Sequence, residues 1–274
     1  MSAKLRQLEL IGQGACAAVY RGLWVGERGS ERPVAIKRLL PALASDARRV
    51  DLFVQEGRLA TRLSHSHLVQ VLELGRDEQG YYLVCEWIEG GSVEALLERC
   101  GPMPWEAAVS IAVAVCEALT YLHQARGPSG EVAPVVHRDV TPANVMVSTA
   151  GEVKLTDLGI AACAADLQGE IVRAGTGRFA APEQLEQGAA DVRVDVYGLA
   201  ATLRAMASSL PAGVESVVAR GMAPLPGERW QTVEALREAL ESAARAAGGV
   251  LGPVPLRAWM ALAPACVPAP RGRD

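Results

Sequence analysis

The stretch HRDVTPAN, residues 137–144, is the most informative part of the chain. It places Asp139 and Asn144 five residues apart in a loop between β-prone runs, and Asp157 follows the second run just ahead of Gly159. Carboxylate and amide oxygens are the ligands that Mg²⁺ prefers, and a carboxylate can also accept the proton of a hydroxyl group. The spacing therefore favours a site for a divalent cation and a substrate hydroxyl.

Two features upstream of this loop contain residue types that bind phosphate. Gly12 and Gly14 lie between two predicted strands, where a glycine hairpin lets backbone N–H groups approach anionic oxygens. Lys37 ends the apolar run at residues 34–36, and Glu56 lies on the helix predicted after it. Each feature alone also has an ordinary explanation, which is a tight turn, an edge-strand lysine or a solvated helix position.

The predicted elements divide the chain into a β-rich part and a helical part. Short β-prone runs are predicted at residues 8–11, 18–25, 33–39, 68–74, 81–87, 135–147 and 152–158, and one early helix at 44–63. Apolar residues recur at helical spacing over 93–98, 105–124, 195–207, 213–221 and 232–247. Residues 248–274 contain repeated prolines, and we expect them to form a poorly packed tail.

Composition excludes several classes of function. The chain has 274 residues and a formal net charge of −4, which argues against nucleic-acid or anionic-membrane binding. The most apolar stretches, residues 107–122 and 250–269, are interrupted by polar residues or by arginine and proline, so no membrane span is predicted. The six cysteines have no C-x-x-C spacing, and the first ten residues have no apolar leader run. We therefore expect free thiols and a cytoplasmic protein.

Taken in order, the glycine loop, VAIK at 34–37, the helix Glu56, HRD…N, D-x-G and GTGRFAAPE at 175–183 resemble the motifs of a protein kinase. The resemblance is to bacterial, eukaryotic-like (Hanks-type) serine/threonine kinases and covers roughly residues 5–245. It implies an α+β, bilobal protein-kinase fold with a small antiparallel β-sheet lobe carrying one helix and a larger, mainly helical lobe. The lobes would span about residues 5–88 and 89–247, followed by a Pro-rich C-terminal tail at 248–274.

The resemblance also implies catalytic roles and the cofactors ATP and Mg²⁺. Lys37, paired with Glu56, would hold the α- and β-phosphates, and Asp139 would orient the substrate hydroxyl and accept its proton. Asn144 and Asp157 would bind Mg²⁺. The other nucleotide contacts implied are Ile11, Gly12, Gly14 and Val19 as a lid, Ala35 and Met146 around adenine, and the backbone of Glu86 and Ile88.

Two structural contacts are implied in the same way. Asp195 would anchor the catalytic loop from below, and Arg229 would form an ion pair with Glu183. Both contacts would hold the larger lobe together around the catalytic loop.

Thr141 is the most serious departure from the family's pattern. Serine/threonine kinases usually carry a lysine there that contacts the γ-phosphate, and losing such a charge lowers rates by about 10²–10³-fold unless it is compensated. Thr141 would still hydrogen-bond a phosphate or Asp139, and Pro142 keeps the Ser/Thr type of loop. Two milder departures are Ala17 for the third loop glycine and Leu158 for the usual phenylalanine.

The segment after Asp157 lacks the usual phosphorylation sites. Residues 158–175 contain no Ser, Thr or Tyr, so we expect Asp166 or Glu170 to supply a permanent anion for Arg138. The region from residue 195 to residue 229, where protein substrates commonly dock, is short for the family.

The implied function is ATP-dependent phosphorylation of Ser/Thr hydroxyls on protein substrates, and a regulatory protein partner is a further expectation. The alternative is a pseudokinase or regulatory nucleotide-binding module with little turnover, suggested by Thr141 and the short region after residue 195. A small-molecule kinase of the aminoglycoside type is disfavoured by residues 175–183, which resemble a peptide-binding segment.

Overall fold

The computed structural model describes residues 4–14, 16–26, 29–127, 129–157, 176–186 and 191–262. They form two compact units. The sheet unit holds the described residues up to 65 and residues 69–87, and the helical unit holds residues 66–68 and the described residues from 88 onward. The α+β fold class predicted from the sequence is confirmed.

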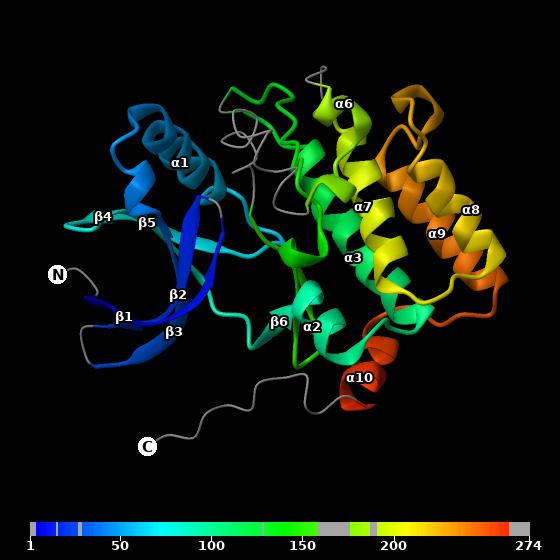
Figure 1. Cartoon of the computed structure of the whole chain (residues 1–274), viewed down its shortest axis with the longest axis horizontal. Coiled ribbons are helices and arrows are strands. Elements are labelled where there is room, and N and C mark those ends of the chain that lie inside the picture. The colour runs from blue at the N-terminus through cyan, green and yellow to red at the C-terminus, as the bar shows by residue number, and fades with distance from the viewer. Residues whose placement is uncertain are drawn as a thin grey trace. The chain divides into compact units, whose positions relative to one another are not determined.

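The sheet unit is built on five antiparallel strands in the order β1-β2-β3-β5-β4 (Figure 1). These strands are β1 (Lys4–Gln13), β2 (Ala17–Val25), β3 (Glu31–Leu39), β4 (Val71–Asp77) and β5 (Gly80–Glu86). Val34 and Ile36 of the central strand β3 pack with Val84 of β5 in a fully buried core. Because side chains alternate along a strand, Lys37 lies on the face opposite this core.

Helix α1 (Ala47–Ala60) packs against β4 and β5 of the sheet. Its buried residues are Phe53, Gly57 and Ala60, spaced for one helix face. Gly57 allows the close approach, since a Cβ atom there would lie 2.6 Å from Cδ2 of Leu83. The sheet therefore fixes the position of the helix that carries Glu56.

Replacing Asp46 by Ala is expected to lower the free energy of unfolding of the sheet unit by about 1 kcal/mol. Asp46 is the N-cap of α1, and its carboxylate accepts hydrogen bonds from the amides of Arg48 and Arg49 at 3.0 and 3.4 Å. Asp46→Asn keeps an acceptor and serves as the control, expected to lie within a few tenths of wild type. Urea unfolding of both variants measures the difference, and equal losses would exclude the capping role.

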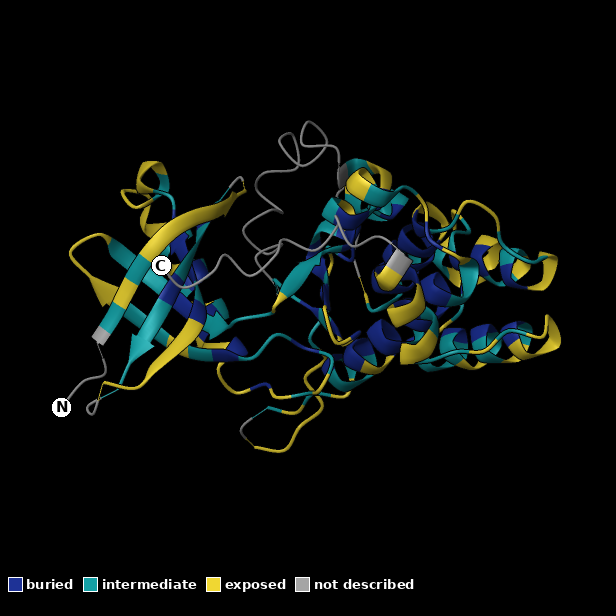
Figure 2. Ribbon diagram, turned by 90° about the horizontal axis from the view of Figure 1, so that it is seen from below, coloured by how far each residue is buried: buried dark blue, intermediate teal, exposed yellow. Residues whose placement is uncertain are grey.

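The helical unit is organised around α3 (Trp105–His123), which contacts α7 (Arg193–Met206), α9 (Val233–Ala246) and α10 (Pro253–Leu262) (Figure 1). Among the described residues, α3 alone is long and apolar enough to cross a membrane, and 61% of that apolar window is buried inside the protein. In Figure 2 the helices of the unit carry buried residues next to exposed ones. Helix α3 is therefore a core helix of the unit, and this explains its apolar sequence.

The other elements of the helical unit complete this core. They are α2 (Val93–Cys100), α6 (Pro182–Leu185), α8 (Ala212–Gly221), the 3-10 turns η2 (Pro142–Asn144), η4 (Thr176–Arg178) and η5 (Pro226–Glu228), and a sheet of β6 (Gly90–Ser92), β7 (Val145–Ser148) and β8 (Val153–Leu155). Residues 207–211 join α7 directly to α8. Strands β7 and β8 lie next to two of the predicted site residues, because β7 begins directly after Asn144 and β8 ends two residues before Asp157.

The expectation of a poorly packed C-terminal tail is wrong for residues 253–262, which form α10. Leu256, Trp259 and Met260 are buried, with exposed fractions of 2%, 7% and 8%. The Arg257 Nε donates to the carbonyl of Ala150, in the turn between β7 and β8, at 2.8 Å. Proline is compatible with the first turn of a helix, where the N–H has no intrahelical partner, so Pro253 begins this helix rather than preventing it.

Three smaller expectations also need correction. The β-prone run at 135–147 forms a strand only from Val145, and the predicted helix at 44–63 is shortened to α1 after the 3-10 turn η1 (Pro41–Leu43). Cys100 is disulfide-bonded, so the expectation of free thiols is wrong there. Cys116 is a buried free thiol, and burial raises its pKa.

Candidate active site

The predicted catalytic loop, residues 137–144, is held in place by one buried carboxylate. Asp195, 1% exposed on α7, accepts a hydrogen bond from the His137 amide on Oδ2 at 2.8 Å and from the Arg138 amide on Oδ1 at 2.6 Å. Oδ2 also accepts from Nε2 of His123 at 2.8 Å. The predicted anchoring role of Asp195 is confirmed, and the contact to His123 is one that sequence reasoning missed.

Asp139 and Asn144 are brought together by the tight turn η2. The Asn144 Nδ2 donates to Oδ2 of Asp139 at 2.7 Å and to the Asp139 carbonyl at 2.9 Å, and the Asn144 amide donates to the Thr141 carbonyl at 3.0 Å. Because the side-chain nitrogen of Asn144 donates to Asp139, the side-chain oxygen of Asn144 is the atom suited to bind a hard cation.

The backbone of strand β8 brings Asp157 to the same loop. The Thr156 amide donates to the Asn144 carbonyl at 2.9 Å, and Nε2 of His137 lies 3.0 Å from the Thr156 carbonyl oxygen. Asp157 has a φ of 63°, a left-handed conformation that is rare for a residue with a side chain. Thus the three predicted oxygen donors, Asp139, Asn144 and Asp157, belong to one hydrogen-bonded part of the helical unit.

Thr141, which lies between Asp139 and Asn144 in the sequence, is buried, with an exposed fraction of 3%. Its hydroxyl Oγ1 has no hydrogen-bond partner among the described residues. Buried hydroxyls are usually paired, so an unpaired one in a catalytic loop calls for a functional explanation. Of the remaining predicted adenine contacts in this unit, Met146 is half-buried on β7, paired with Ser92 and Lys154, and Ile88 is half-buried ahead of β6.

Three of the predicted nucleotide-binding residues of the sheet unit lie on one face of the sheet: Val19, Ala35 and Lys37. Lys37 on β3 pairs in register with Val19 on β2, and Ala35 pairs with Cys85 on β5. Residues two apart on a strand share a face, so Val19, Ala35, Lys37 and Cys85 all face away from the core of Val34 and Ile36. Lys37 is 8% exposed. These side chains form an apolar surface around Lys37, and Arg21, which pairs with Ala35, lies on the same face.

The glycine loop leaves open space above its backbone. A Cβ atom at Gly12 would meet nothing within 4 Å, and one at Gly14 would meet only the Ala17 carbonyl oxygen at 3.9 Å. Packing within the described residues therefore does not require these glycines. Ile11, beside them on β1, is 48% exposed, as expected of a side chain that lies over a ligand.

Glu56 and Glu86 occupy fixed positions in the sheet unit. Glu56 is half-buried on α1, and its pairing with Lys37 stays a prediction. Glu86 ends β5, where its amide donates to the Gln70 carbonyl and its carboxylate accepts from the Gln70 amide, both at 2.9 Å. These contacts hold the backbone that is predicted to meet adenine.

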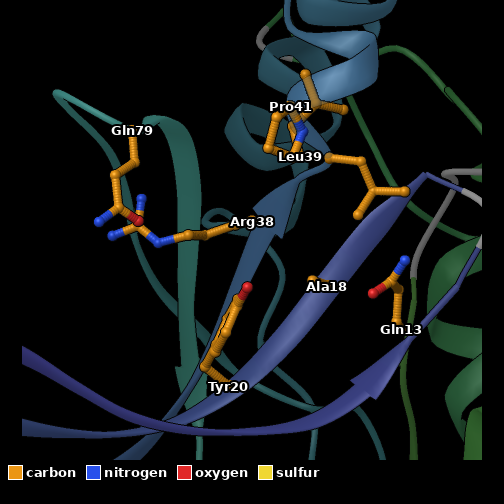
Figure 3. A pocket seen from close by; sticks show the side chains of 8 residues that line it. Gln13, Ala18, Tyr20, Arg38, Leu39, Pro41 and Gln79 are labelled. Carbon is orange, nitrogen blue, oxygen red and sulfur yellow. The ribbon is translucent and has the colours of Figure 1, made fainter.

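A cavity of about 510 Å³ in the sheet unit lies elsewhere (Figure 3). Its walls include Gln13, Tyr20, Arg38, Pro41 and Gln79. Arg38 follows Lys37 in the strand and so points to the opposite face, where it forms hydrogen bonds with Asp77 at 2.9 and 2.6 Å and lowers the pKa of that carboxyl. The cavity is therefore separate from the predicted nucleotide face.

The segment around α6, residues 177–186, which overlaps the predicted peptide platform and is called the peptide-platform segment below, is held by a buried ion pair. Arg229 is fully buried and binds Glu183 through two hydrogen bonds of 2.6 and 2.7 Å, which confirms the predicted pair. Gln184, next in sequence, accepts from the Ala181 amide and donates to the Arg138 carbonyl. Sequence reasoning missed Gln184, although a glutamine at the third helical position is a recognisable capping signal.

Some expectations concern residues that the structure does not describe. Leu158, Asp166 and Glu170 lie outside the described residues, so the permanent-anion hypothesis for Arg138 stays a prediction. Within the described residues, no group of three His, Cys, Asp or Glu side chains is placed to hold a metal ion. The predicted Mg²⁺ ligands are instead one carboxylate and one amide.

Comparison with known proteins agrees with this geometry. A family model described as a protein kinase domain matches residues 5–216. The serine/threonine-protein kinase PknL of Mycobacterium tuberculosis is 39% identical over 69% of the chain and 45% of its own length. The tyrosine-protein kinase MasK of Myxococcus xanthus is 28% identical over 85% of the chain and 42% of its own length. The chain thus spans less than half the length of these relatives.

Solved structures also match the chain to a protein kinase domain. The crystal structure of the Mycobacterium tuberculosis PknI kinase domain matches with a TM-score of 0.67 at 25% identity. The match covers 89% of this chain and 98% of that one. The similarity extends well beyond the isolated motifs.

Proposed function

Because the chain belongs to the protein kinase family, we propose that it transfers the γ-phosphate of ATP to serine and threonine hydroxyls of protein substrates. The observation that carries this proposal is the grouping of Asp139, Asn144 and Asp157 on a loop whose backbone is bound to the buried Asp195. The comparisons give no support to the pseudokinase alternative.

The proposed chemistry depends mainly on positioning. Asp139 accepts the proton of the substrate hydroxyl as the oxygen attacks phosphorus, and its contact with Asn144 sets the direction of its carboxylate. Lys37 contributes a fixed positive charge beside the phosphates, and Gly12 and Gly14 leave room for them. Asn144 and Asp157 would hold Mg²⁺, which supplies charge that neutralises the transferring phosphoryl group. The donor set fits this ion, since all its groups are oxygens.

Serine and threonine are favoured over tyrosine as acceptors. Three observations support this choice: the names of the PknL, PknB and PknK relatives, the 39% identity to PknL, and Pro142 at the start of η2, which matches the Ser/Thr type of loop. MasK, whose name specifies tyrosine, is a more distant match at 28% identity.

Incubation with γ-labelled ATP and a mixed protein substrate tests the proposal. The wild-type chain is expected to label serine and threonine above the background of an Asp139→Asn chain, as read by phosphoamino-acid analysis. Label on tyrosine alone would contradict the acceptor class. Transfer no higher than that of the Asp139→Asn chain would contradict the activity.

Replacing Thr141 by Val is expected to lower kcat about tenfold while leaving the melting temperature unchanged or slightly raised. The hydroxyl has no partner among the described residues, so its removal relieves an unpaired buried polar group. The loss of kcat reflects a hydrogen bond that the hydroxyl makes to phosphate or to Asp139 during transfer. Steady-state kinetics and thermal unfolding measure the two effects. A lowered melting temperature with unchanged kcat would contradict both.

A further inference from the structure

Arg138, the residue before Asp139, adopts a strained backbone conformation. Its φ is 65°, and within the described residues only Asp157 shares a positive φ among non-glycine residues. A residue with a Cβ atom keeps such a conformation only when its surroundings hold it there. Since the φ and ψ angles of Arg138 determine where the next residue points, whatever holds Arg138 also aims Asp139.

Both backbone polar groups of Arg138 are held by side chains from other helices. Its amide donates to Oδ1 of Asp195 on α7 at 2.6 Å, the anchor implied by the family resemblance. Its carbonyl accepts from Nε2 of Gln184 on α6 at 2.9 Å. The second contact involves the peptide group that links Arg138 to Asp139, so it acts directly on the direction of the catalytic side chain.

Both polar atoms of the Gln184 side-chain amide are hydrogen-bonded. Its Oε1 accepts from the Ala181 amide at 3.0 Å, and Ala181 is completely buried. A backbone amide requires an acceptor and a carbonyl requires a donor, so the two partners determine which way the side-chain amide faces. The preceding residue, Glu183, is bound to the buried Arg229. Gln184 is therefore a short rigid connection between the peptide-platform segment and the catalytic loop.

We propose that Gln184 is a positioning residue: it clamps the Arg138 carbonyl and thereby couples the order of the peptide-platform segment, residues 177–186, to the alignment of Asp139. This inference rests on the proposed kinase function. Gln184 would affect catalysis without binding nucleotide or metal itself. The clamp acts on the chemical step rather than on the affinity for ATP.

Two variants of Gln184 separate the clamp from the helix cap. Gln184→Met keeps the length of the side chain and removes both hydrogen bonds. Gln184→Glu keeps an acceptor for the Ala181 amide and places a carboxylate oxygen against the Arg138 carbonyl. Both variants are expected to lower kcat roughly tenfold, which corresponds to the loss of about one net hydrogen bond, with KM for ATP unchanged.

Gln231→Met is the matched control. The Gln231 Nε2 also donates to backbone carbonyls, those of Pro226, Gly227 and Arg229 at 3.2, 3.3 and 2.8 Å, and none of these partners belongs to the catalytic loop. We expect this variant to lower the melting temperature at least as much as Gln184→Met while kcat stays at the wild-type value. A loss of kcat that follows the loss of stability across all three variants would reduce Gln184 to a structural residue and overturn the proposal.

Hydrogen exchange keeps the test independent of turnover. In Gln184→Met, a peptide covering residues 136–140 is expected to exchange faster than in wild type, and α9 is expected to exchange at an unchanged rate. If the wild-type chain transfers no phosphate, the proposed kinase function fails, and this measurement alone then decides on the clamp. Unchanged exchange in this peptide, with or without activity, would overturn the inference.

Discussion

An Asp139→Asn chain is expected to transfer phosphate about 10²–10⁴-fold more slowly than the wild-type chain, the range typical for loss of a positioned general base. Asn has nearly the same shape as Asp, and its side-chain oxygen can still accept the 2.7 Å hydrogen bond from Nδ2 of Asn144. The amide cannot take up the proton of a hydroxyl at neutral pH. The change therefore removes proton transfer while preserving the turn around η2.

Measuring the rate at saturating ATP and substrate, together with the melting temperature, tests this expectation. Asp51→Asn, on the exposed side of α1, is the control for removing a carboxylate and is expected to leave the rate unchanged. If the Asp139→Asn chain melts at the wild-type temperature and transfers at more than a tenth of the wild-type rate, Asp139 is not the base.

The second large effect concerns stability rather than rate. Glu183→Ala is expected to lower the free energy of unfolding of the helical unit by about 3–5 kcal/mol, because it leaves the guanidinium of Arg229 buried without its counter-charge. The Arg229 side chain is 0% exposed and that of Glu183 is 15% exposed. Carbonyl groups of Ala223 and Pro224 also accept from Arg229, but they cannot replace a full negative charge.

The pair between Arg193 and Asp191 offers a control ion pair at the surface. Its closest distance is also 2.6 Å, but the two side chains are 28% and 51% exposed. The Arg193 guanidinium lowers the pKa of Asp191, yet solvent screening limits the stabilisation of exposed pairs to about 0–1 kcal/mol. Urea unfolding followed by far-UV circular dichroism compares Asp191→Ala with Glu183→Ala. Similar losses in the two variants would contradict the burial argument.

Replacing both members of the buried pair provides a further test of the burial argument. A Glu183→Leu, Arg229→Met chain is expected to be closer to wild type in stability than Glu183→Ala, because it leaves no buried charge unpaired. If the double variant is less stable than both the wild type and Glu183→Ala, the pair itself stabilises the fold, and the cost of an unpaired buried charge is not the dominant effect.

The chemistry of the candidate site could be predicted from the sequence because its residues are close together in the chain. Asp139 and Asn144 are separated by a single tight turn, so their spacing alone indicated that they would meet. The Asp195 anchor and the Glu183–Arg229 pair join distant positions, and these came from the family resemblance rather than from any local pattern. All three contacts are confirmed in the helical unit.

The errors have identifiable physical causes. Residues 135–144 have the apolar character of a strand, but the amides of His137 and Arg138 donate to the Asp195 carboxylate instead of to a neighbouring strand. The prolines around α10 suggested a loose tail, yet burial of Trp259 and Met260 outweighed that local signal. Gln184 and His123 bind partners 46 and 72 residues away in the sequence. Such long-range contacts leave no pattern in a short stretch of sequence.

The packing of α9 and α10 on α3 has a practical consequence for expressing this protein. The family match ends at residue 216, in the middle of α8, which spans Ala212–Gly221. A fragment that stopped there would lose every helix that follows and would expose the side of α3 that those helices cover. A stable recombinant domain must therefore extend at least to Leu262, because the helix ending there also holds the turn between β7 and β8 through Arg257.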